Sequence, residues 1–195
     1  MNISSTYSNT TSSQSEPSRG CLPHSKDNSI KHWHVAYTKM HHERKVRDAL
    51  LLQGIEAFVA VRIEQKQWSD RVKKKEVVLL PMYLFVRVTR EEQRQVLEHP
   101  SVLRYLCLKG EHKPAVIPDD QMDRFRFMLD YSEEAVQMLP EQIQAGQKVR
   151  VIKGSLKGLE GEFVDFEGKY RIVLKIDYLG SASVSMPPGY IEVIN

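Results

Sequence analysis

The sequence VVLLPMYLFVRV, residues 77–88, is the longest nearly uninterrupted apolar stretch of the chain, and β-branched and aromatic side chains dominate it. Val77 to Leu80 and Tyr83 to Val88 each have the length of a β-strand. Pro81 lacks the backbone N–H that a central strand needs, so we expect it at a bend. The stretch therefore predicts two core strands that meet at Pro81, covered by the rest of a domain.

Strand and helix patterns flank this stretch on both sides. Residues 32–39 alternate so that Trp33, Val35 and Tyr37 share one face. A helix is predicted for residues 41–53, where apolar side chains recur at helical spacing and Gly54 follows as a stop signal. The other predicted elements are a strand at 55–61, a helix at 90–98 with Val96 and Leu97 inward, a strand at 102–108 and a helix at 118–130. This order predicts an α+β fold of the split βαβ, ferredoxin-like type.

Residues 62–76 form a basic, polar segment between two of these strands. Arg62, Lys66, Arg71 and Lys73 to Lys75 surround the polar turn at Trp68, which predicts a hairpin with a basic tip. Such a tip could contact phosphates and unstacked bases. The alternative, which the pattern slightly favours, is a solvated loop with Trp68 packed on the sheet.

Around the first domain, the chain contains a tail, a linker and a second domain. Residues 1–30 are rich in Ser, Thr and Asn and poor in large apolar side chains, which predicts a disordered tail. The first domain then covers residues 31–130, and residues 131–145 are acidic, contain Pro140 and predict a linker. Residues 146–195 contain five short β-rich runs separated by recurring glycines, which predicts a small β-barrel.

The amino-acid composition limits the classes of function that we expect for this protein. Residues 31–130 contain 19 basic and 14 acidic side chains, a modest excess that would suit contact with phosphates. The two cysteines, Cys21 and Cys107, have no partner at zinc spacing, and His41 and His42 point apart on a helix, so we expect neither a metal nor a cofactor. No nucleophile with a plausible base and no phosphate-binding loop is evident, so we expect no enzyme. No apolar window approaches the length of a membrane span, and the expected location is the cytoplasm.

The sequence GQKVRVIKGSLKGLEGEFV, residues 146–164, closely resembles a KOW motif, in which Gly161 enters the second strand where a Cβ would clash. Residues 33–38, the 80–86 stretch, His99 to Val102 and Ile117-Pro118 resemble the NusG N-terminal domain in order and spacing. The resemblance implies a NusG N-terminal domain followed by a KOW domain with an SH3-like barrel. Residues 68–71 and 176–180 are most similar to the RfaH-like and UpxY-type antiterminators of capsular polysaccharide operons. Met82 and Ser181 replace a glycine and an arginine that are usual in housekeeping members.

The resemblance implies several contacts with the transcription machinery. Tyr37, Tyr83 and Phe85 match the surface that binds the clamp helices of the largest subunit of bacterial RNA polymerase, although they could instead belong to the core of the domain. Basic residues resemble the face turned toward the non-template DNA strand or nascent RNA, and a loop resembles the one that contacts a small-subunit ribosomal protein or Rho. These residues are Lys39, His41, Arg44 and Arg47 for nucleic acid, and Ile176, Tyr178, Leu179 and Gly180 for the loop.

Two functions follow from the resemblance. The first is a monomeric, non-enzymatic elongation and antitermination factor that promotes read-through of a long operon. The second is a ribosome-associated RNA-binding protein that uses its KOW domain. Leu179 occupies the position of a phenylalanine in the housekeeping protein, which predicts weak or absent binding of Rho. The glycines of the second domain predict that it stays a barrel and does not switch to helices.

Overall fold

The computed structural model describes residues 29–67, 72–139, 146–166 and 168–194. The first 28 residues and the tip of the predicted hairpin at 68–71 lie outside this part. Within it, no helix is both long and apolar enough to cross a membrane.

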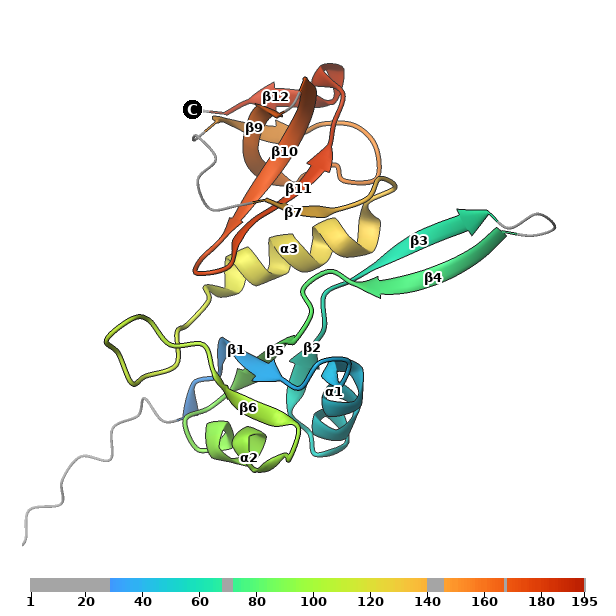
Figure 1. Cartoon of the computed structure of the whole chain (residues 1–195). Helices are drawn as coiled ribbons and strands as arrows, with labels where there is room; N and C mark the ends of the chain where they lie inside the picture. The colour runs from blue at the N-terminus through green and yellow to red at the C-terminus, as the bar shows by residue number, and fades with distance from the viewer. Residues whose placement is uncertain (1–28, 68–71, 140–145, 167, 195) are drawn as a thin grey trace, which may run out of the picture.

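The first domain contains a four-stranded antiparallel sheet in the order β2-β5-β1-β6. Its helices α1 and α2 pack on one face, and α3 lies on the other face (Figure 1). This is the α+β arrangement that the sequence predicts. The strands are β1 (His32–Thr38), β2 (Glu56–Phe58), β5 (Tyr83–Val88) and β6 (Val102–Tyr105), and the helices are α1 (Glu43–Leu52), α2 (Glu92–Glu98) and α3 (Asp119–Tyr131).

The helices follow from their apolar spacing. Val46 and Leu50, one turn apart on α1, are fully buried against Leu84 and Val86 of β5. Gly54 ends this helix with a φ of 78°, a left-handed conformation that glycine adopts without strain. On α2, Val96 is buried as expected, but Leu97 is 45% exposed. The expectation that Leu97 faces inward is wrong, because a helix of seven residues presents only one narrow stripe to the sheet.

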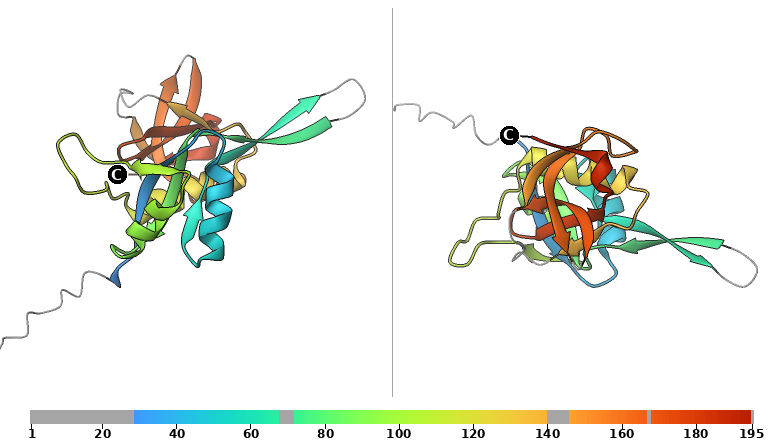
Figure 2. Two further views of the ribbon diagram at one scale, coloured as in Figure 1. Left: turned by 60° about the horizontal axis from the view of Figure 1, so that its bottom comes forward. Right: turned by 90° about the horizontal axis from the view of Figure 1, so that it is seen from above.

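The stretch at residues 77–88 divides between two sheets. Its second half is β5, a central strand with Leu84, Phe85 and Val86 fully buried. Its first half ends β4 (Val72–Val78), which pairs only with β3 (Val61–Gln67) in a separate two-stranded ribbon that projects from the body of the molecule (Figures 1 and 2). The bend at Pro81 is therefore confirmed, whereas the first half is not a core strand of the main sheet.

The second sheet has six antiparallel strands in the order β12-β8-β9-β10-β11-β7. Five of them match the five β-rich runs of the sequence. The sixth, β7, falls inside the segment expected to be a linker, where Val136 and Leu139 are buried. Among the described residues the two outer strands, β12 and β7, do not pair, so no closed barrel forms. The strands are β7 (Gln137–Leu139), β8 (Gln147–Val151), β9 (Glu160–Phe166), β10 (Lys169–Ile176), β11 (Gly180–Ser185) and β12 (Ile191–Val193).

Helix α3 joins the two halves of the molecule. It contacts β1 on one side and β10 on the other, so that it forms a layer between the two sheets (Figure 1). Phe125 of α3, Phe85 of the first sheet and Ile172 of the second belong to one continuous cluster of buried residues. One continuous core therefore connects the two sheets through this helix, and a second buried cluster lies between the first sheet and helices α1 and α2.

Candidate functional site

Two half-exposed tyrosines lie side by side on the α3 face of the first sheet. Tyr37 of β1 is directly opposite Tyr83 of β5, and their ring centroids are 4.9 Å apart with the ring planes at 61°. Arg104 of β6, paired with Tyr37 on its other side, places its guanidinium carbon 4.5 Å from the centroid of the Tyr37 ring. We call Tyr37, Tyr83 and Arg104 the tyrosine patch. It combines exposed aromatic surface with a positive charge.

The Tyr37 hydroxyl stays protonated at all ordinary pH values. Partial burial, followed by the hydrogen bond to Tyr83, raises the pKa of Tyr37 to about 12, although the nearby charge of Arg104 opposes the shift. A neutral phenol can donate a hydrogen bond as well as accept one. The patch can therefore offer a partner both ring surface and a hydroxyl donor, a combination common at protein interfaces.

Glu43, at the start of α1, fixes the backbone next to the tyrosine patch. Its side chain is only 3% exposed, and its Oε1 accepts hydrogen bonds from the backbone N–H of Met82 at 2.6 Å and of His41 at 3.3 Å. Met82 has a φ of 70°, and its carbonyl accepts the N–H of Thr38 at 2.8 Å. A left-handed conformation is costly for a side chain with a Cβ, so these hydrogen bonds hold the turn that leads into Tyr83.

Phe85 does not belong to this exposed surface. It lies two residues after Tyr83 on the same face, but it is 0% exposed and packs against Phe58 and Phe125 with ring centroids 5.9 Å away in both cases. The expectation that Phe85 contacts a partner is therefore not met in this arrangement. The reason is that α3 crosses the sheet over Phe85 and leaves the Tyr37 and Tyr83 end of the face half-exposed.

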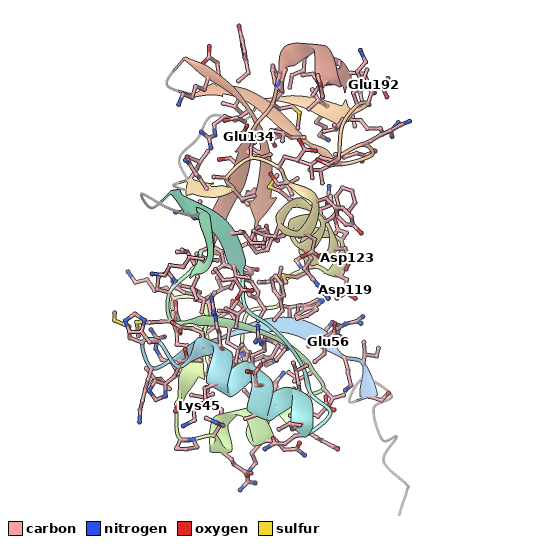
Figure 3. The ribbon with its side chains drawn as sticks, turned by 90° about the vertical axis from the view of Figure 1, so that its right-hand side faces the viewer. Lys45, Glu56, Asp119, Asp123, Glu134 and Glu192 are labelled. Carbon is pink, nitrogen blue, oxygen red and sulfur yellow. The ribbon has the colours of Figure 1, made fainter. Side chains whose placement is uncertain are left out.

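Ionic contacts fix where α3 crosses the sheet. Arg126 of α3 lies over the rings of Trp33 and Phe58, at 5.7 and 5.5 Å from their centroids, and pairs with Glu56 at 3.1 Å. Arg87 of β5 also bridges the two layers, since it lies 2.9 Å from Asp119 and 3.8 Å from Glu56. Figure 3 shows Glu56 and Asp119 on the same side of the molecule, where the sheet and the start of α3 face each other.

The four basic residues expected to contact nucleic acid lie around the start of α1. Lys39 and His41 are exposed. Arg44 is partly engaged, because it pairs with the Glu76 carboxylate at 3.3 Å and donates to the Glu76 carbonyl at 3.1 Å, and Arg47 pairs with the adjacent Asp48. A cleft of about 460 Å³ separates α1 from β4, and His41, Arg44 and Lys75 contribute to its walls. The structure thus brings this basic group next to the projecting ribbon.

The loop expected to bind a partner is partly covered by α3. Ile176 is 1% exposed, Leu179 is half-buried in the common core, and the Asp177 N–H donates to Gln121 Oε1 of α3 at 2.8 Å. Tyr178, with a φ of 67°, is 42% exposed. Gly180 has a φ of 96° and begins β11. Of the four residues expected to bind a partner, only Tyr178 presents a largely exposed side chain.

Sequence reasoning did not identify Arg104, Glu43 or Gln121 as parts of these sites. Arg104 lies in a predicted strand, but only the pairing of β1 with β6 places it beside Tyr37. Glu43 carries a charge at a helix start, where an acidic residue is normally exposed. Its hydrogen-bond partner, the N–H of Met82, is 39 residues away in sequence, so no local sequence pattern predicts their contact.

Comparison with known proteins finds a family model that is similar to the first domain. Residues 31–126 match the NusG family model, described as transcription termination factor nusG. These residues are therefore similar to a NusG-family domain. The matched range includes the tyrosine patch, the ribbon and the basic residues of α1, and it ends within α3.

Three solved structures are also similar to the chain. The chain is similar to a structure that describes domain interaction in Thermotoga maritima NusG, with 18% identity, a TM-score of 0.45 and coverage of 85% of this chain and 98% of that one. It is also similar to chains from the MjSpt4:Spt5 complex. For conformation A the identity is 12% and the TM-score 0.28, and the match covers 84% of this chain and 98% of that one. For conformation B the identity is 13% and the TM-score 0.29, and the match covers 84% of this chain and 97% of that one. No curated protein matches the chain.

Proposed function

We propose that this protein is a non-enzymatic transcription elongation and antitermination factor whose NusG-family domain binds bacterial RNA polymerase. The observation that carries the proposal is the tyrosine patch. Two half-exposed aromatic rings and an arginine, held on a rigid sheet, have the composition of a protein-binding hot spot. The clamp helices of the largest polymerase subunit are the partner that the family resemblance suggests, and they would dock by laying a helical surface on the patch.

The basic residues at the start of α1 support a second contact, with the non-template DNA strand or nascent RNA. Lys39, His41, Arg44 and Arg47 lie on the same domain as the patch and near one end of the sheet. Arg44 and Arg47 would have to exchange their present carboxylate partners for phosphates. Exchange of this kind costs little, because both ion pairs are partly exposed to solvent.

The six-stranded sheet is proposed to be a KOW domain that recruits a second partner. Gly161 supports this, because a Cβ at this position would lie 2.7 Å from the Val173 carbonyl oxygen. The loop at residues 176–180 would bind a small-subunit ribosomal protein, with weak or absent binding of Rho. Ile176 and Leu179 are covered by α3 here, so a contact that uses the whole loop requires the second sheet to separate from that helix.

The specialised role that we propose is read-through of a long operon, such as one for capsular polysaccharide. It rests on the resemblance to UpxY-type proteins and on Met82 and Ser181, which depart from the housekeeping pattern. Such a factor would work in the cytoplasm, at the nucleoid, through polymerase. The alternative, a KOW-type RNA-binding protein of the ribosome, would use the second sheet and leave the tyrosine patch without a role.

A pull-down with core RNA polymerase tests the proposal. We expect Tyr37→Ala combined with Tyr83→Ala to abolish binding, and Arg104→Ala, on an exposed side chain, to weaken it without affecting the fold. Tyr131→Ala, which removes an exposed tyrosine from α3, serves as the matched control and should bind normally. Undiminished binding by both patch variants would exclude the tyrosine patch as the docking surface, and capture of ribosomes without polymerase would favour the alternative.

A further inference from the structure

A cleft of about 450 Å³ lies at the end of the first sheet that is farthest from the tyrosine patch. His32 of β1 and Val88 of β5 line it and form one end of the register between these strands. The pair Tyr37 and Tyr83 forms the other end, roughly 17 Å away at about 3.3 Å per residue. Because successive strand residues alternate between faces, His32 and Tyr37 also lie on opposite faces of the sheet. The cleft is therefore separate from the surface proposed to bind polymerase.

Three segments of the chain form this cleft. They are the start of β1, the connection from β5 into α2, and the loop between β6 and α3 (Figure 1). The loop is fixed beside β1, because the N–H of Ile117 donates to the Trp33 carbonyl at 2.9 Å and the two residues form a β-bridge. The polar side chains that line the cleft, which we call the histidine cleft, are His32, His34, Arg90, Gln93, His112 and Lys113.

The permanent charges that line the histidine cleft all have one sign. Arg90 and Lys113 are exposed, and within the described residues neither forms an ion pair or a side-chain hydrogen bond. None of the described residues that line this cleft is acidic, whereas Glu43 and Glu76 line the cleft between α1 and β4. Two cations that converge on one cleft without a carboxylate in its walls indicate an anionic ligand.

Buried groups hold one neutral polar side chain of the cleft in place. His34 is 3% exposed, and its Nδ1 lies 2.8 Å from the Ala115 carbonyl oxygen, which can only accept, so Nδ1 carries the proton. Burial lowers the pKa of His34, and the neutral ring therefore uses Nε2 to accept a hydrogen bond from the Gln93 amide at 3.1 Å. The Tyr105 hydroxyl donates to the Gln93 carbonyl, also at 3.1 Å. The Gln93 amide has a second N–H, which is thus positioned in advance for a ligand.

We propose that the histidine cleft binds a small phosphorylated molecule of the nucleoside diphosphate or triphosphate class. An arginine contacts phosphate oxygens through two parallel N–H groups, and a lysine contacts them as a point charge. Arg90 and Lys113 come from different segments, so together they can hold more than one phosphate group. The N–H groups of Gln93 and of the imidazoles can donate to the remaining oxygens. This inference goes beyond the proposed binding of polymerase and does not depend on it.

The size and the apolar walls of the cleft favour a small molecule over a nucleic-acid strand. Its volume lies within the range of about 300–1,000 Å³ that small-molecule sites have. Ile30 and Val116, which are 51% and 43% exposed, belong to its lining and would lose water when they cover the nucleoside. None of the described lining residues is Phe, Tyr or Trp, the side chains on which successive bases of a single strand stack.

Binding of ADP and GDP to the full-length protein, measured by isothermal titration calorimetry with pyrophosphate as a comparison, tests the proposal. We expect at least one nucleotide to bind more tightly than pyrophosphate, because pyrophosphate leaves Ile30 and Val116 uncovered. Arg90→Gln and Lys113→Gln should each weaken nucleotide binding about tenfold, as the loss of a charge-assisted hydrogen bond does. Val116→Asp places a negative charge in the cleft and should abolish binding.

Arg94→Gln and Lys109→Gln are the matched controls. Arg94 lies four residues after Arg90, on α2, and Lys109 lies four residues before Lys113 in the same loop. Both side chains are exposed and outside the lining of the cleft. Each control should change nucleotide affinity by less than about twofold at about 0.15 M salt, where charges more than about 8 Å apart are largely screened.

Four results would overturn the proposal. Neither ADP nor GDP binds at millimolar concentration, or pyrophosphate binds as tightly as both nucleotides. The controls lose as much affinity as Arg90→Gln and Lys113→Gln, which would mean that net charge matters and the cleft does not. A single-stranded oligonucleotide binds through Arg90 and Lys113 while the nucleotides do not. The tyrosine patch is intact in every variant, so the polymerase pull-down can succeed where this proposal fails.

Discussion

Replacement of Glu43 by alanine is expected to destabilise the first domain by about 3 kcal/mol. The buried carboxylate accepts two backbone N–H groups, from Met82 and His41. A hydrogen bond to a charged group contributes roughly 1.5–3 kcal/mol, and the longer bond at 3.3 Å is expected at the low end or below. Glu43→Gln retains an oxygen acceptor and loses only the charge, so it should cost about 1 kcal/mol.

Urea denaturation provides the free energies of unfolding, and hydrogen exchange of the Met82 amide reports on the turn itself. The Met82 amide should exchange much faster in Glu43→Ala than in the wild-type protein. Glu98→Ala is the matched control, since this exposed glutamate of α2 makes only a 3.7 Å ion pair with Arg94 and its loss should cost less than about 0.5 kcal/mol. The reasoning is refuted if Glu43→Ala is as stable as Glu98→Ala, or if glutamine is no better than alanine at position 43.

Two further changes test the core of each sheet. Burial lowers the pKa of His34, whose Nδ1 lies 2.8 Å from the Ala115 carbonyl. The neutral form of His34 therefore contributes fully to stability above the unfolded pKa of about 6.5, and this contribution is lost as the pH falls below that value. The free energy of unfolding should decline between pH 7 and pH 5, and His34→Gln should reduce this decline whereas His112→Gln, on an exposed side chain, should not. Gly161→Ala should destabilise the protein by about 1–3 kcal/mol. The new Cβ would lie 2.7 Å from the Val173 carbonyl oxygen and 3.0 Å from Ile172 Cγ1 and Leu174 Cδ2. Gly189→Ala, with no atom within 4 Å of the new Cβ, should leave the thermal unfolding temperature unchanged.

The order and type of most elements could be predicted from sequence because each depends on a local pattern. The alternation around Trp33 and Val35 predicts β1, and the spacing of Val46 and Leu50 predicts α1. These patterns record which side of an element is apolar. They do not record what covers it. For this reason Val77 and Val78, as apolar as β5, could not be recognised as part of a separate ribbon.

The burial of Phe85 shows that, at the candidate site too, a sequence pattern does not reveal what covers an apolar face. Tyr83 and Phe85 lie on the same face of one strand, and their sequence environment is alike. What distinguishes them is the path of α3, which begins 34 residues after Phe85 and crosses the sheet over Phe58 and Phe85. Side chains on the same strand face can thus differ in exposure because of an element that is distant in sequence.

Helix α3 also determines which of the two proposed protein contacts is available in this arrangement. On the side of the first sheet it leaves Tyr37 and Tyr83 half-exposed, so a polymerase helix could reach the tyrosine patch without any movement of α3. On the side of the second sheet it covers Ile176 and Leu179 and accepts a hydrogen bond from the loop. A partner of the whole loop must therefore compete with α3 for the same apolar surface, whereas a partner of the tyrosine patch need not.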